Sequence, residues 1–118
     1  MGKTRTVRGE VVLPPADSLT QSADLLVQVE DISRADAPSV VLGEFRRRNV
    51  SLRAGAAYPF SVSIPADLID ERHLYSVRAH VDVSGTGSVT RGDFVSTQIY
   101  PVLTRSHGDE VRVSVKRV

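Results

Sequence analysis

His80 and Asp82 are the clearest pair of residues able to do chemistry, because they lie two positions apart. Residues at i and i+2 of a strand point to the same face, so an imidazole and a carboxylate would lie side by side. Such a pair can bind a metal ion, or the carboxylate can orient the imidazole as a general base. The local spacing offers no third ligand, and Ser76 and Arg78 belong to the same face. We therefore interpret this face as solvated, and predict no catalytic residue, metal site or cofactor.

One glycine- and serine-rich segment could hold a nucleophile or form a phosphate-binding loop, namely Ser84-Gly85-Thr86-Gly87-Ser88. Its serines stand outside its glycines, so it does not match the Gly-x-Ser-x-Gly nucleophile motif. It is too short for a phosphate-binding loop, and no helix follows it. The chain also contains no cysteine, which excludes disulfides and thiolate chemistry. The segment predicts a hairpin turn, and the protein as a whole is predicted not to be an enzyme.

Three consecutive arginines could bind a phosphate group or an acidic partner: Arg46, Arg47 and Arg48. Strand alternation would send Arg46 and Arg48 to one face and Arg47 to the other. The net charge is +1 and aromatic residues make up only 5% of the chain, which argues against nucleic-acid binding. Charge of this kind is typical of an exposed sheet edge. We therefore take Val40, Leu42 and the three arginines as candidate partner-binding residues.

The elements that must position these residues are strands. Apolar and polar residues alternate through most of the chain, which is the pattern of half-buried strands. Only residues 65–71 indicate a short helical turn, with Pro65 at its start. The pattern is typical of a two-sheet sandwich or a small barrel, and we predict an all-β, seven-stranded, two-sheet antiparallel sandwich of prealbumin- or immunoglobulin-like architecture. The expected strands cover residues 7–13, 25–29, 40–50, 58–64, 75–83, 89–100 and 111–115.

Length and composition indicate one globular domain over residues 1–118, with 41% apolar and 25% charged residues. No apolar run reaches the ~18 residues that a membrane-spanning helix needs. Residues 1–6 lead straight into a strand pattern without the features of a signal peptide. We expect these six residues to be flexible, or to be a start added to a mature domain.

Several motifs in one order resemble a known family of bacterial envelope proteins. They are Leu13-Pro14-Pro15, the turn from Asp31 to Pro38, Pro59-Phe60-Ser61-Val62, Ile69-Asp70, Tyr75-Ser76-Val77-Arg78-Ala79 and Tyr100-Pro101-Val102-Leu103-Thr104. From about Val7 to Val115 the chain resembles the YbaY-like proteins, which belong with the YscW-type lipoprotein chaperones of type III secretion. The resemblance implies a β-sandwich in the cell envelope, usually anchored to the outer membrane as a lipoprotein.

The best understood members of this family are pilotins, which escort a secretin subunit to the outer membrane. The resemblance therefore implies a non-enzymatic accessory domain that binds a protein or peptide, such as a secretin or another envelope protein, in the periplasm or at the outer membrane. The lipobox cysteine usual in the family is absent here, and without a signal peptide a cytoplasmic location stays open. The alternative is an envelope domain that is structural or binds a lipid or glycan.

Some family positions are expected to serve the architecture. Ser33 and Asp36 should satisfy backbone donors in the turn before Pro38. Tyr75 should lie in the core, with Arg78 facing the other way. We expect Arg78 simply to face solvent; the alternative is a buried Arg78 paired with a carboxylate, for which we take Asp70.

Overall fold

The computed structural model describes residues 2–15, 21–34 and 36–118. These contain eight strands and one 3-10 turn, and no helix among them is long and apolar enough to cross a membrane. The elements are β1 (Thr4–Val12), β2 (Ser22–Asp31), β3 (Val40–Ser51), β4 (Ala57–Pro65), the turn η1 (Ala66–Leu68), β5 (Tyr75–Asp82), β6 (Phe94–Ser96), β7 (Pro101–Val102) and β8 (Glu110–Arg117). The protein is all-β, as predicted.

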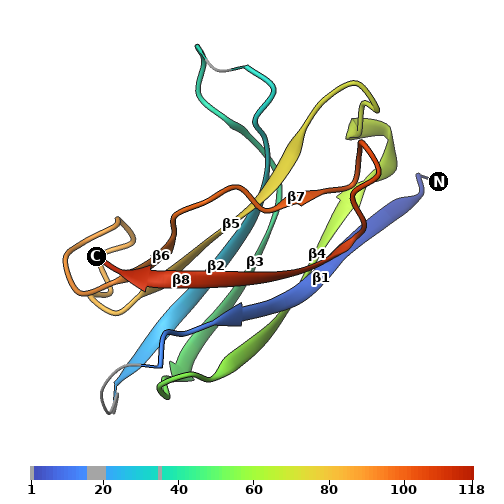
Figure 1. The fold of residues 1–118 in the computed structure, drawn as a ribbon. Coiled ribbons are helices and arrows are strands. Elements are labelled where there is room, and N and C mark those ends of the chain that lie inside the picture. Colours follow the sequence, from blue (N-terminus) through green and yellow to red (C-terminus); the bar gives the residue numbers. More distant parts are fainter. Residues whose placement is uncertain (1, 16–20, 35) are drawn as a thin grey trace.

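The strands form one continuous hydrogen-bonded sheet in the order β3-β2-β5-β6-β8-β1-β4, with β7 added on β5 (Figure 1). The two ends of this path, β3 and β4, lie close together. The sheet is therefore nearly closed and resembles a barrel, with an incomplete seam between its first and last strands.

The predicted two-sheet antiparallel sandwich needs correction, because β8 joins what would have been two separate sheets. Its first half, Glu110–Ser114, pairs in parallel with Arg8–Val12 of β1. Its second half, Val115–Arg117, pairs antiparallel with β6. An alternating sequence shows that β8 is a strand, but it does not show that the strand changes neighbours halfway along its length.

The strand expected over residues 89–100 is much shorter, since only Phe94–Ser96 is a strand in this range, and Pro101–Val102 follows as a separate short strand. Gly92 has a positive φ of 97°, and the Asp93 backbone turns back toward Thr90. The helical turn expected at 65–71 is shorter, at Ala66–Leu68. At the start of the chain, Thr4–Thr6 belong to β1 and pair with β4, although we expected them to be flexible.

The core lies inside the curled sheet. Every second residue of each strand points inward and contributes its side chain to this core. Val7 and Val11 of β1 and Val27 and Val29 of β2 all belong to this valine-rich interior, and Tyr75 is buried as expected. Other large side chains with almost no exposure are Leu13, Ile64, Val62, Val77, Phe94, Val102 and Val113.

The outer face of β5 is covered, although the sequence predicted it to be solvated. Ser76 and His80 are both buried, and only Arg78 between them is exposed. Tyr100 lies over Ser76 and donates its backbone N–H to Ser76 Oγ at 2.9 Å. The loop that follows β5 returns over His80 through Asp93. Chain segments after β5, and not a second sheet, thus bury this polar face.

Candidate partner-binding groove

The seam between β3 and β4 is tight at Gly43. A Cβ atom at this position would lie 3.0 Å from Val62 Cγ1 and 3.1 Å from the Ser63 carbonyl oxygen. Glycine thus lets the β3 backbone approach β4 closely. No ladder joins these two strands within the described ranges, so each keeps an edge that no other strand pairs.

Farther along β3 the seam opens, at Phe45 and Arg47. These residues and Gly43 pair in register with Val27, Leu25 and Val29, which are all buried. Cross-strand partners share a face, so Phe45 and Arg47 stand at inward-facing positions of the sheet. Phe45 is half-buried and Arg47 is exposed. An arginine at an inward-facing position is tolerated here because the barrel is incomplete.

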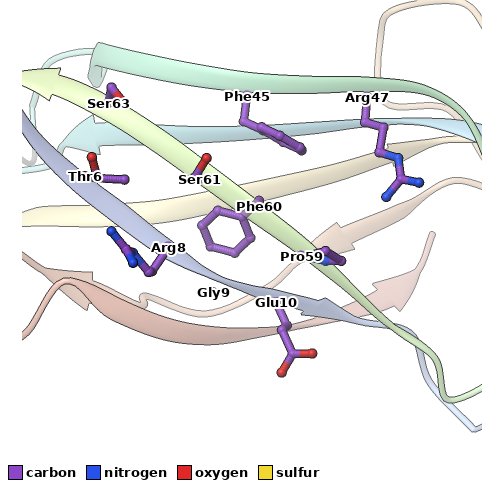
Figure 2. Close-up of a pocket in the computed structure, with 10 residues that line it drawn as sticks. All are labelled: Thr6, Arg8, Gly9, Glu10, Phe45, Arg47, Pro59, Phe60, Ser61 and Ser63. Carbon is purple, nitrogen blue, oxygen red and sulfur yellow. The ribbon is translucent and has the colours of Figure 1, made fainter.

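A groove of about 820 Å³ lies across β1 and β4 and reaches Phe45 and Arg47 (Figure 2). Phe60, only 4% exposed, lies beneath the backbone of Gly9, where a Cβ would come within 3.2 Å of its ring. Arg8, Glu10 and Arg47 supply charges to the groove, and Ser61 and Ser63 of β4 supply hydroxyl groups.

The chemistry of this groove suits recognition rather than catalysis. Phe45 and Pro59 offer an apolar surface with few internal degrees of freedom, backed by the buried Phe60, on which an apolar side chain can pack. Arg8 and Arg47 can each form a bidentate pair with a carboxylate. The arrangement fits a peptide segment with an apolar anchor flanked by an acidic residue.

The five candidate partner-binding residues do not meet at one site. Arg47 enters the groove, whereas Arg46 and Arg48 line a separate hollow with His80 and Asp82, as strand alternation predicts. Val40 borders a third hollow and is 64% exposed. Leu42 packs half-buried against the core. Phe45, which the sequence analysis did not select, is the neighbour of Arg47 in the groove.

Arg78 faces solvent, as expected, and the alternative pairing with Asp70 is not found. Asp70 accepts hydrogen bonds from Arg72 Nε and Nη2, both at 3.1 Å, and these bonds lower its pKa to about 2. The Arg78 side chain is 58% exposed and lies 4.0 Å from Glu30. Asp70 follows the η1 turn and precedes the start of β5, whereas Arg78 lies in the middle of β5 on its outer face.

The turn before β3 is held by polar contacts to the segment before β5. Ser33 Oγ accepts the backbone N–H of Leu74 at 2.8 Å, and Asp31 Oδ1 accepts that of Ser33 at 3.0 Å. His73 Nδ1 lies 2.6 Å from Asp31 Oδ2. Burial opposes ionisation of Asp31, but the bonds from Ser33 and His73 prevail and lower its pKa. Asp36 and Pro38 are exposed in the same turn.

The His80–Asp82 pair acquires a third member, a second carboxylate, that its local spacing did not reveal. Asp93, 11 positions beyond Asp82, places Oδ2 2.9 Å from His80 Nε2. The metal-binding atoms of all three residues lie within 4.8 Å of one another. Asp93 stands in a loop without strand periodicity, so no signal in the sequence connects it to His80.

Comparison with known families agrees with this architecture. The family model of the type III secretion system lipoprotein chaperone, YscW, matches residues 2–115, almost the whole chain. The chain belongs to this family. The resemblance deduced from the turn and core motifs is thereby confirmed. No curated protein sequence matches this YscW-family chain.

A solved structure similar to this YscW-family protein is that of an alternative pilotin from the type II secretion system of Vibrio cholerae. The TM-score is 0.76 at 22% sequence identity, and the match covers 98% of this chain and 100% of the pilotin. At this level of identity the likeness establishes the fold. Family membership indicates a chaperone of the secretion apparatus and a role other than catalysis.

Proposed function

We propose that this protein is a pilotin-like chaperone that binds the C-terminal segment of a secretin in the groove between β3 and the β1–β4 pair. The observation that carries the proposal is the open seam itself, where Phe45 and Arg47 occupy inward-facing positions above Pro59 and Phe60. We further propose that the protein works in the periplasm, at the outer membrane, where a secretin assembles.

The groove can both bind the secretin segment and fix its orientation. Well-packed aromatic anchors and arginines carry most of the binding energy in protein interfaces. The tight point of the seam at Gly43 and the strand pairing of β1 with β4 hold Phe45 and Phe60 in place. A groove formed in advance lowers the cost of ordering a peptide on binding.

The test is a titration of the 15N-labelled protein with peptides from the C-terminus of the secretin encoded in the same genome. We expect the largest shifts at Phe45, Arg47 and Ser61, and saturation at micromolar peptide. Phe45→Ala should weaken binding about 10- to 100-fold, because truncating a buried aromatic anchor costs ~2 kcal/mol or more. The absence of any shift at millimolar peptide would contradict the proposal.

Neighbouring arginines provide the matched control. Arg47→Glu should weaken binding at least about 10-fold, because it replaces an attractive charge in the groove by a repulsive one. Arg48→Glu makes the same change of charge one residue away, but on the opposite face of β3. It should leave the affinity nearly unchanged at physiological salt. Equal losses in the two variants would indicate general electrostatic attraction and no groove-specific recognition.

A further inference from the structure

Asp93 is a fully buried carboxylate, with 0% of its surface exposed. Its Oδ1 accepts the backbone N–H groups of Val83 and Ser84, at 2.9 and 3.0 Å. Its Oδ2 accepts the N–H of Thr90 at 3.0 Å and lies 2.9 Å from His80 Nε2. The carboxylate thus accepts bonds from three backbone N–H groups and lies beside the His80 ring, so both of its oxygens are held in fixed positions.

A second carboxylate faces the same point. Ser84 Oγ lies 3.0 Å from Asp82 Oδ1 and 3.4 Å from Asp93 Oδ2. A serine hydroxyl has one proton and can donate it to only one of these two oxygens. Two carboxylates thus converge on one hydroxyl group, with the His80 ring beside them. A buried carboxylate needs compensation, and a cation between the two carboxylates would supply it.

The spacing of the atoms suits a cation in this place. A tetrahedral zinc ion with bonds of about 2.0–2.1 Å holds its ligand atoms about 3.3 Å apart. His80 Nε2 and Asp93 Oδ2 are 2.9 Å apart, and Asp82 lies within 4.8 Å of both. The three ligand atoms thus lie within reach of one position, with Ser84 Oγ beside them.

The cluster is also accessible from outside. His80 and Asp82 line a hollow of about 300 Å³ that opens between β3 and the loop after β5. Arg46 and Arg48 line the same hollow and oppose the entry of a cation, but Arg46 is engaged with Glu44 at 3.2 Å. A water molecule can reach the open position of a metal held by three protein ligands.

We propose that His80, Asp82 and Asp93 form a binding site for one divalent transition-metal ion of the zinc type. An imidazole and two carboxylates are a donor set that Zn²⁺ and Co²⁺ accept. The ion links β5 to the loop of residues 83–93, which lies over the outer face of this strand. The site is separate from the groove, and binding of metal does not depend on the proposed chaperone function.

The experiment uses the full chain without a polyhistidine tag, stripped of metal with a chelator and then dialysed. Titration with Co²⁺ should give visible absorption of a four-coordinate site that saturates at one ion per chain. Zn²⁺ should displace it and raise the melting temperature by a few degrees, because a ligand of the native state stabilises it. His80→Gln and Asp82→Asn should each lower the affinity at least about 10-fold.

Two histidine variants serve as controls. His107→Gln changes an exposed histidine, and His73→Gln changes the histidine beside Asp31 and Asp70. Both should keep the full absorption, and circular dichroism should show that every variant is folded. The proposal is overturned if the chain takes up no Co²⁺ below millimolar concentration. It is equally overturned if uptake survives in both His80→Gln and Asp82→Asn, or disappears in His73→Gln.

Discussion

At the scale of single residues, carboxylates hold the irregular parts of this protein in place. Asp93 gathers the loop after β5, Asp82 accepts the N–H groups of Gly85 and Gly87, and Asp31 supports the turn before β3. Each has an oxygen aimed at backbone donors that strand pairing leaves free. Asp31 and Asp82 accept bonds from donors two to five residues away, whereas the role of Asp93 depends on where the chain returns and could not be assigned from residue type.

Asp93→Asn should destabilise the protein by about 2–4 kcal/mol, because the amide cannot accept all the bonds that the carboxylate accepts and leaves His80 without its partner. Urea denaturation at pH 7 measures this difference. Asp67→Asn, an exposed change within η1, is the control and should lie within about 0.5 kcal/mol of the parent.

The pH dependence of stability gives a further prediction for Asp93. Its pKa of about 2 in the folded state lies below the ordinary 3.8, so the unfolded state binds more protons as the pH falls. The stabilisation is fully present above about pH 4 and is lost toward pH 2. Stability of Asp93→Asn should therefore fall less steeply than that of the parent between pH 4 and 2. Parallel curves would contradict this role of Asp93.

At the scale of elements, the pairing of β1 with β8 depends on a glycine. A Cβ at Gly9 would lie 1.7 Å from the Val111 carbonyl oxygen, in the parallel ladder. That atom belongs to the backbone and cannot move aside alone. Gly9 falls within the strand expected over residues 7–13, but nothing in the sequence indicates the close approach of a strand about 100 residues away.

Gly9→Ala should accordingly destabilise the protein by about 3 kcal/mol or more, since overpacking against a backbone atom forces strands apart. Thermal unfolding followed by circular dichroism measures the loss. Gly108→Ala is the matched control, because the nearest atom to its Cβ would be 4.0 Å away. If the two substitutions cost the same, the effect comes from glycine flexibility in the unfolded chain and not from packing.

At the scale of the whole molecule, β8 is the strand that makes one sheet out of two groups of strands. It alone connects β6 to β1 in the hydrogen-bonded path, and β1 carries β4 with it. This connection joins residues from opposite ends of the chain, such as Arg8 and Glu110. Most of the fold therefore forms only when distant segments meet.

Removal of residues 110–118 should abolish cooperative folding, because β1 and β4 lose their hydrogen-bonded link to the rest of the sheet. Near-ultraviolet circular dichroism and the dispersion of amide proton resonances report the loss. Removal of residues 1–2, which precede β1, is the control and should leave a folded domain. A dispersed spectrum for the chain without residues 110–118 would show that the two groups of strands associate through side chains alone.

The sequence by itself determined the all-β class, the family, most strand positions and the division of the arginines between two faces. These properties rest on a two-residue alternation that local geometry imposes, and on motifs that lie within short segments. Arg47, for example, was placed opposite Arg46 and Arg48 because neighbouring residues of a strand always point to opposite faces.

Tertiary structure decided the nearly closed barrel, the groove at Phe45 and the meeting of Asp93 with His80. Each depends on which distant segments lie together: β8 between β6 and β1, β3 beside β4, and the loop of residues 83–93 over β5. Alternation specifies the face on which a side chain lies, but it carries no information about the segment that will cover that face. This is why Ser76 and His80, predicted to be solvated, are buried.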